Sequence, residues 1–469
     1  MFRPAILLLS GNAFASLLLL ARNLIVARLI PVEDYGIAAT FAVAMAVVEM
    51  MSALGLQQQI VQAKEGDDPH FQAALQGFQL LRGVISGAAL FLIAGPLARF
   101  LGIGEVAWAY QALALVPVLN ALQHFDIHRM NRQMVFGPML MTGAAPALLS
   151  VLAVWPLSLW SGDYRVMLYA ILIQAAVGAI TSHLVAERPY RLAFDREIIA
   201  RSLRFGWPIL VNGVLMFLVF QGDKLIVGRE LGMEALAVFS LGMTLTLTPT
   251  LVLAKSASNY FLPPLSRAQH EGQAAASDLA LVTLQAVLSA SLLFLVALAL
   301  LGPVLIDLLL GAKYVALQPL LTWFAIMQTL RVFKAAPAII ALAAGKSANP
   351  MIANLVRLLA LPPCWYVAAT SGDLTLILWI AILGELAGHV VAMGLIGRTI
   401  RLGDRGVILP HLAAALLLAA VAAMAELHLL TDIRAAVALL ALFALGLTCQ
   451  PHLRRHLRQA GPVNDRRRE

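Results

Sequence analysis

Long apolar runs recur from one end of the chain to the other, and they constrain its fold more than any other feature. Runs of twenty or more mainly apolar residues fill the 469-residue sequence. Each is long enough to cross the ~30 Å hydrocarbon core of a bilayer as an α-helix. Charged residues make up only 12% of the chain, against about a quarter in soluble domains. The sequence therefore predicts an all-α polytopic membrane protein.

Fourteen membrane spans are predicted, and their even number places both termini on one side of the membrane. Their ranges are 6–30, 35–62, 72–101, 107–127, 136–160, 165–186, 206–230, 235–263, 279–310, 317–344, 350–370, 374–397, 407–427 and 433–449. Of the 33 Lys and Arg residues, twenty lie at the termini or in one alternate set of connections, and six lie in or beside the other set. Because cytoplasmic loops carry the excess of Lys and Arg, both termini are expected in the cytoplasm.

An internal repeat predicts how the spans are organised. The segment "LIVARLIPVE" (24–33) aligns with "LIVGRELGME" (225–234) at a shift of 201 residues. Two six-helix bundles, 1–200 and 201–397, follow from this shift, and such paired halves are common in secondary transporters. The predicted remainder is two extra transmembrane helices (398–450) and a basic cytoplasmic tail (451–469).

Seven cationic residues fall inside the predicted spans, where a charge facing lipid is costly. They are Arg22, Arg82, Lys224, Lys255, Arg331, Lys334 and Arg357. At about 2.5–3.5 kcal/mol each, seven lipid-facing cations would cost about 20 kcal/mol, more than a typical free energy of unfolding. Most of them should therefore face water or an anion, and we expect them to line a cationic lumen that binds an anionic substrate.

Local ion pairs are the alternative explanation for these charges. Three acids also lie within spans, Glu49, Asp223 and Glu385, and each could neutralise one cation or couple transport to an ion. Lys224 and Lys255 lie toward helix ends, where long side chains can reach the interface. Seven cations against three acids still leave a positive excess. His389, four residues after Glu385, could join a proton relay.

Several motifs resemble those of the polysaccharide, or O-antigen, flippases. The first is residues 21–62, with an arginine in the first helix, a short loop ending in "EDYG", and a second helix closing in "GLQQQIVQ". The second half offers "GDKLIVGRELGMEALAVFSLG" (222–242) and "NYFLPPLSRAQ" (259–269), which resembles a Pro-x-x-Ser turn of that family. The same superfamily contains lipid II flippases and multidrug and toxin extrusion transporters.

The resemblance implies a function without catalysis. It implies that undecaprenyl-pyrophosphate-linked oligosaccharide is moved from the cytoplasmic to the periplasmic leaflet of the bacterial inner membrane. It also implies contact with membrane lipids and with polysaccharide polymerase machinery, and no nucleic-acid partner. The expected energy source is a proton or sodium gradient. We expect the protein to have no cofactor, no metal and no catalytic residue. Cys364 and Cys449, far apart in apolar segments, are expected to form no disulfide.

Two other functions remain as alternatives. A multidrug exporter of the same superfamily would share the architecture, but a lumen for organic cations should be acidic, whereas cations outnumber acids within these spans. A polysaccharide polymerase or ligase is the alternative enzyme. Members of those enzyme families are expected to have a substantial periplasmic loop, whereas the predicted periplasmic loops of this chain are short.

Overall fold

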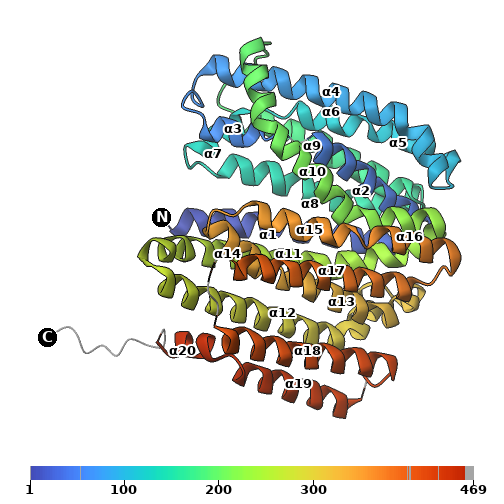
Figure 1. The fold of residues 1–469 in the computed structure, drawn as a ribbon. Helices are drawn as coiled ribbons and strands as arrows, with labels where there is room; N and C mark the ends of the chain where they lie inside the picture. The colour runs from blue at the N-terminus through green and yellow to red at the C-terminus, as the bar shows by residue number, and fades with distance from the viewer. Residues whose placement is uncertain (1, 53, 399, 401–402, 431, 460–469) are drawn as a thin grey trace. The chain divides into compact units, whose positions relative to one another are not determined.

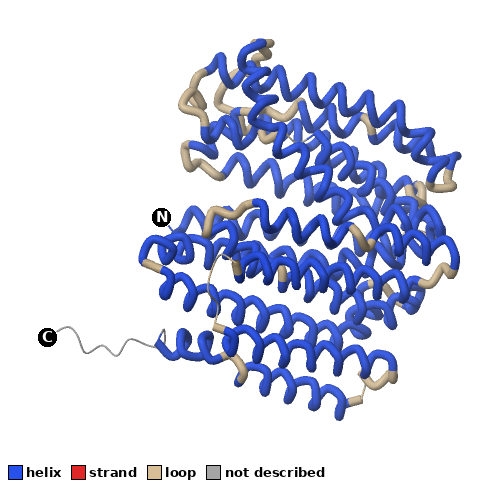
Figure 2. Tube along the Cα trace, viewed as in Figure 1, coloured by secondary structure: helices blue, strands red, loops and turns tan. Residues whose placement is uncertain are grey.

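The computed structural model describes residues 2–52, 54–398, 400, 403–430 and 432–459. Throughout these residues the chain forms helices joined by short connections, and the described part contains no strand (Figures 1 and 2). The prediction of an all-α polytopic fold is confirmed. The last ten residues of the predicted basic tail, 460–469, lie outside the described residues.

The chain divides into two compact units, Met1–Ser240 and Leu241–Glu469. The predicted division at residue 200 into two six-helix bundles stays a prediction. The helices of the first unit are α1 (Phe2–Leu29), α2 (Val32–Ser52), α3 (Leu56–Gln62), α4 (Pro69–Phe100), η1 (Gly104–Val106), α5 (Ala107–Leu113), α6 (Leu115–Ala121), α7 (Asp126–Arg132), α8 (Gly137–Trp160), α9 (Arg165–Leu184) and α10 (Arg196–Glu230). Helix α11 (Gly232–Glu271) contains the boundary between the units.

The second unit continues with long apolar helices. They are α12 (Gln273–Leu309), η2 (Ala312–Leu317), α13 (Gln318–Phe333), α14 (Ala335–Ala343), α15 (Ala348–Leu358), α16 (Leu361–Thr370), α17 (Leu374–Gly397), α18 (Asp404–Glu426), α19 (Ile433–Thr448) and α20 (Pro451–Gln459). Helices α13 and α18 both pack against α12, and α13 and α15 both pack against α17. A core of Leu, Val, Ala and Phe side chains from α12, α13, α18 and α19 holds this unit together.

Each of the fourteen predicted spans contains a helix or a broken run of helices, but the count of fourteen is not confirmed. By length and apolarity, ten described helices can cross a membrane, or up to twelve if each of two bent pairs is one span. The predicted span 35–62 is two helices, because α2 ends at Ser52 and α3 begins at Leu56. The span 350–370 breaks before Pro362 and Pro363, since proline cannot continue the backbone hydrogen bonding of a helix.

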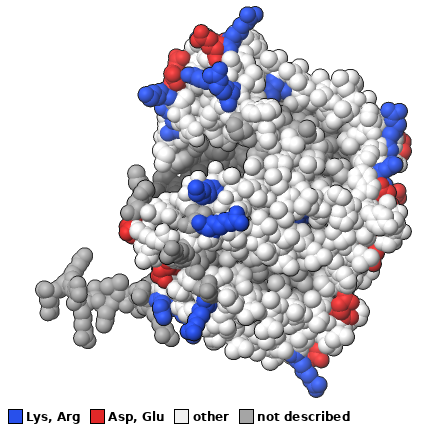
Figure 3. Space-filling view, viewed as in Figure 1, with Lys and Arg blue, Asp and Glu red and all other residues white. Residues whose placement is uncertain are grey.

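Charged side chains follow the ends of the helices. On the face drawn in Figure 3, nearly all Lys, Arg, Asp and Glu side chains gather near the helix ends, and uncharged atoms cover the stretches between them. This pattern is expected for helices whose middle portions lie in hydrocarbon. The cations buried within the helices are therefore the exceptions that a functional interpretation must explain.

Candidate functional site

Four of the residues singled out in the sequence meet in the second unit, around one carboxylate. Glu385, in the middle of α17, accepts hydrogen bonds through Oε1 from Arg331 Nε at 2.9 Å and Arg331 Nη2 at 2.8 Å. Arg357 Nε donates to the same oxygen at 3.1 Å, and Lys334 Nζ lies 2.6 Å from Oε2. Arg357 and Glu385 are fully buried, while the side chains of Arg331 and Lys334 are 11% and 9% exposed. We call these four residues the Glu385 cluster.

The local sequence explains how three cations reach one acid. Arg331 and Lys334 are three residues apart, so they project from the same side of α13 and the break that follows it. Two glycines flank the acid on α17: a Cβ at Gly384 would lie 2.7 Å from Ala360 Cβ, and one at Gly388 would lie 2.9 Å from the Ala353 carbonyl oxygen. Small residues spaced four apart allow helices to approach closely. The two glycines thus bring α15 and its arginine against α17.

The Glu385 cluster carries an excess of positive charge. Helices α13 to α17, with the break at Lys334, contain three cationic residues, Arg331, Lys334 and Arg357, and the one acidic residue of these helices is Glu385. Glu385 does form local ion pairs, as the alternative expects, but its single negative charge is shared among three cations. An anion of two or more negative charges would complement the remaining charge.

Arg22 has a different environment, in the first unit. Its Nη1 donates to Ser150 Oγ at 3.0 Å and to Gln174 Oε1 at 2.5 Å, which ties α1 to α8 and α9. Ser150 Oγ in turn donates to the Ala170 carbonyl oxygen at 2.9 Å. Arg22 is 8% exposed, and its Nε has no hydrogen-bond partner among the described residues. Neutral oxygens therefore hold this arginine and leave its charge in place.

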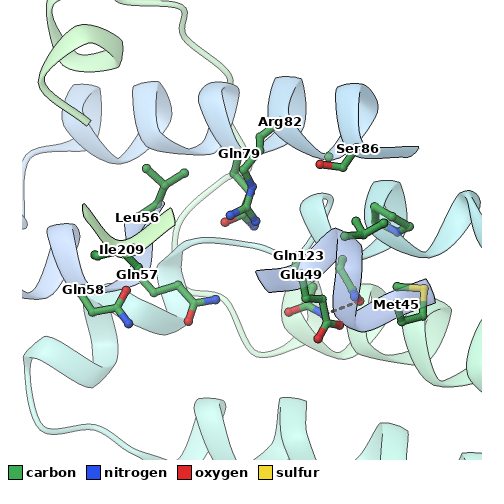
Figure 4. A pocket seen from close by; sticks show the side chains of 15 residues that line it. Met45, Glu49, Leu56, Gln57, Gln58, Gln79, Arg82, Ser86, Gln123 and Ile209 are labelled. Atoms are coloured by element: carbon green, nitrogen blue, oxygen red, sulfur yellow. Dashed lines mark hydrogen bonds between the residues drawn. The ribbon is translucent and has the colours of Figure 1, made fainter. Parts of the chain in front are cut away.

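Glu49 and Arg82 line a pocket of about 370 Å³ in the first unit. The pocket lies between α2, α3, α4, α6 and α10. In Figure 4, Gln79, Arg82 and Ser86 extend from α4 toward the side chains of Glu49 and Gln123 on the opposite side. Met45, Leu56, Pro117 and Ile209 are among the apolar lining residues, and the polar ones are Glu49, Gln57, Gln58, Gln79, Arg82, Ser86, Asn120 and Gln123.

The other predicted site residues lie on the two helices around the unit boundary. Asp223 and Lys224 lie on α10, where Asp223 is buried and Lys224 is half-buried. Lys255 lies on α11 and is exposed. The structure thus groups four of the ten residues in the Glu385 cluster and two in the pocket. That the seven cations line one lumen, and that the three acids couple transport to an ion, stay predictions.

Sequence reasoning missed several polar residues that the structure places beside the predicted ones. Ser150 holds Arg22, and Gln57, Gln58, Ser86 and Gln123 line the pocket. Gln57 and Gln58 belong to the "GLQQQIVQ" segment, which resembles a motif of the polysaccharide flippases. The three successive glutamines of this segment, near the intramembrane Glu49 in the sequence, could have indicated the polar pocket.

His389 has a partner that the sequence did not indicate. Its Nε2 lies 3.2 Å from His411 Nε2 on α18, and His411 Nδ1 lies 2.7 Å from the Val407 carbonyl oxygen. Since a carbonyl oxygen only accepts, His411 carries its proton on Nδ1, and His389 Nε2 is then the donor between the rings when both are neutral. A role for His389 in a proton relay stays a prediction.

A polytopic helical fold with buried cations and a polar pocket defines a multi-pass membrane protein rather than a soluble domain. Comparison of the sequence with known families agrees with this class. The model of the polysaccharide biosynthesis protein family matches residues 25–319. The chain belongs to this family.

Two curated relatives are named for the biosynthesis of succinoglycan and of amylovoran. The succinoglycan biosynthesis transport protein ExoT of Rhizobium meliloti (strain 1021) is 22% identical over 55% of this chain and 52% of its own length. The amylovoran biosynthesis protein AmsL of Erwinia amylovora is 27% identical over 38% of this chain and 48% of its own length. The chain thus spans about half the length of these relatives.

Solved structures share the fold at low identity. An inward-facing multidrug resistance transporter of the MATE family, within the MOP superfamily, has a TM-score of 0.69 and 16% identity, covering 84% of this chain and 97% of its own. The lipid II flippase MurJ, in an inward closed conformation, also has a TM-score of 0.69 and 16% identity, covering 96% of this chain and 99% of its own. At such identity these structures establish the fold, and the function must be argued from the residues.

Proposed function

We propose that this protein flips an undecaprenyl-pyrophosphate-linked oligosaccharide from the cytoplasmic to the periplasmic leaflet of the bacterial inner membrane. The glycan would serve the assembly of a cell-surface polysaccharide such as O-antigen, capsule or exopolysaccharide. Membership in the polysaccharide biosynthesis protein family supports this function. The basic connections and tail support a cytoplasmic position for both termini.

The observation that carries the proposal is the positive excess of the Glu385 cluster. A diphosphate joins the lipid to the sugar in such a substrate, and it carries at least two negative charges near neutral pH. Arginine and lysine donate strong charge-assisted hydrogen bonds to phosphate oxygens. Arg331 and Lys334 are the two cations of the cluster that retain some exposure. They are therefore the first contacts we assign to the diphosphate.

The proposed mechanism is alternating access. The inward-open state draws the diphosphate into the cationic lumen while the lipid tail remains in the bilayer, and rocking of the two halves then opens the lumen to the periplasm. The break at Lys334 between α13 and α14 places a cluster cation where the helix is already interrupted. Movement at this break would change the distance of Lys334 from Glu385 directly.

An ion gradient is the proposed energy source, either of protons or of sodium. Glu49, Asp223 and Glu385 are the acids that could bind the ion. Glu385 already contacts three cations, whereas Glu49 lines an open pocket beside the single cation Arg82. Glu49 is therefore the strongest candidate for a carboxylate that gains and loses an ion during the cycle.

Accumulation of lipid-linked oligosaccharide in cells lacking this protein tests the proposal. The cells are complemented with wild type, Arg22→Ala, Arg331→Ala or the double variant Arg331→Ala with Lys334→Ala, each first shown to reach the membrane in equal amounts. Arg434→Ala, at an exposed arginine in the first turn of α19, is the matched control. We expect the precursor to accumulate on the cytoplasmic face, and the double variant to clear it least.

Two results would refute the proposal. An unchanged lipid-linked pool and unchanged surface polysaccharide in the deletion strain would exclude flipping, and efflux of cationic dyes would then be the next assay. Full clearance by the double variant would show that the Glu385 cluster is not on the substrate path.

A further inference from the structure

The pocket of the first unit is chemically unlike the Glu385 cluster, because its charges balance whenever Glu49 is ionised. Among its lining residues are one cation, Arg82, and one acid, Glu49, which lie close enough to interact electrostatically. A diphosphate bound there would meet no net positive charge, and a second anion beside Glu49 would be repelled. The pocket therefore suits an uncharged ligand.

Most of the polar side chains that line this pocket are amides. Five of the lining residues are amides, contributed by α3, α4, α6 and the connection after α6: Gln57, Gln58, Gln79, Asn120 and Gln123. Each amide carries both a donor and an acceptor, as does each hydroxyl group of a sugar. A set of amides can thus bind several neighbouring hydroxyls whatever the orientation of each O–H bond.

The existing hydrogen bonds of these amides leave room for a ligand. Gln123 Nε2 donates to Asn120 Oδ1 at 3.4 Å, and Gln79 Nε2 donates to the Ala121 carbonyl oxygen at 3.5 Å. Both distances are longer than the roughly 2.7–3.2 Å that is usual for N–H···O hydrogen bonds. Neither bond is strong enough to hold these side chains away from a hydroxyl that offers a shorter one.

The pocket also has a fixed frame and apolar lining residues. A Cβ at Gly83 would lie 2.2 Å from Ala121 Cβ, so α4 and α6 pack in direct contact at this point. Met45, Leu56 and Ile209 add apolar surface to the lining. A sugar ring combines the same two kinds of surface, with hydroxyls at its edge and C–H groups on its faces. The volume of about 370 Å³ falls within the range of small-molecule sites.

We propose that this pocket binds one uncharged sugar unit of the lipid-linked glycan, held mainly by Gln79, Asn120 and Gln123. This inference rests on the proposed function, which supplies the glycan, and it adds a division of roles. The neutral amide pocket recognises sugar, and the Glu385 cluster recognises diphosphate. Selection among glycans would then depend on the first unit, because a diphosphate is common to all such substrates.

Protection of an introduced thiol tests the pocket directly. Ser86→Cys is made in a Cys364→Ala, Cys449→Ser background, which removes both native cysteines. Labelling by N-ethylmaleimide is then timed in membranes from cells that make the lipid-linked glycan and from cells lacking its first glycosyltransferase. Thr142→Cys, on α8 and outside the pocket, is the control for general accessibility.

A second arm uses purified protein and defined probes. Glucose, galactose, mannose and N-acetylglucosamine are titrated against the labelling rate of Ser86→Cys, with inorganic pyrophosphate titrated separately. We expect slower labelling in glycan-containing membranes and with at least one sugar, and no protection by pyrophosphate. Gln123→Leu should lower the affinity for the protecting sugar by about 2- to 12-fold, which is the effect of one net hydrogen bond. Arg331→Ala should leave sugar protection unchanged.

The outcomes separate this inference from the proposed function. Equal labelling rates in both membranes together with no protection by any sugar would overturn the sugar pocket, as would protection by pyrophosphate. These results leave a positive accumulation assay intact, in which case the protein flips its substrate without a sugar site in this pocket. If sugars protect the purified protein but the lipid-linked pool of the deletion strain is unchanged, the proposed flippase function is refuted and the sugar pocket stands.

Discussion

Replacing Glu385 by glutamine removes the one negative charge that three buried cations share. Glutamine keeps the size of the side chain and one acceptor oxygen, so the change removes the charge and turns the second acceptor into an NH2 donor. In the wild type, Arg331, Lys334 and Arg357 all lie within 3.1 Å of a Glu385 oxygen. After the substitution they would face one another with no carboxylate among them.

The structure sets the size of the expected loss. Removing one partner from a buried ion pair typically costs about 3–5 kcal/mol, because the other charge stays buried and uncompensated. In this cluster one substitution leaves three uncompensated charges, so we expect the free energy of unfolding to fall by at least that amount. For a unit of this length, each kcal/mol lowers the melting temperature by about 2–4 °C, which gives a decrease of about 6–20 °C.

A double-substitution cycle makes the expected loss refutable. Arg331→Gln alone should lower the melting temperature less than Glu385→Gln, because Glu385 keeps Lys334 and Arg357 as partners. Added to Glu385→Gln, the same Arg331→Gln change should raise the melting temperature, since it removes one of the repelling charges. The measurement is thermal unfolding of the purified variants in detergent.

A melting temperature that is lower still in the double variant would refute the interpretation that Glu385 compensates all three cations. A decrease of less than about 2 °C for Glu385→Gln alone would also refute it. Glu426→Gln, at the exposed end of α18, is the matched control and should leave the melting temperature unchanged.

Two further predictions concern the packing and the pH response of the first unit. A Cβ at Gly36 would lie 1.9 Å from the Met233 carbonyl oxygen, so Gly36→Ala should lower the melting temperature, whereas Gly143→Ala, which meets nothing within 4 Å, should keep or raise it. A hydrogen bond from His70 and backbone N–H groups lower the pKa of Asp195. A carboxyl group whose pKa is lower in the folded state stabilises that state at pH values above its unfolded pKa of about 3.9. This stabilisation is lost as the pH falls from the unfolded pKa through the lower, folded pKa, so the stability of the protein should decrease over that range. Melting temperatures measured against pH should decline less steeply for Asp195→Asn, which keeps the capping oxygen of α10, and an unchanged slope would contradict the prediction.

The helices of this protein were largely predictable, because membrane helices are local structures. Apolar runs of sufficient length identify the helical regions, since every backbone polar group in hydrocarbon must be satisfied within its own segment. The breaks were harder to predict. Pro362 and Pro363 explain the start of α16, but the separation of α3 from α2 after Ser52 depends on where α3 packs against α7 and α10.

The sequence by itself determined that the chain is a polytopic helical membrane protein and that cations lie inside its spans. It also indicated that Arg331 and Lys334 share a helix face, because spacing along a helix decides direction. Only the tertiary structure decided that Arg357 joins them on Glu385, and that Arg22 is held by Ser150 and Gln174. The same is true of the amides that surround Arg82 and Glu49 in one pocket. The physical reason is that these contacts join residues distant in the chain, and similar apolar surfaces on many helices leave the choice of neighbours to the packing of the whole unit.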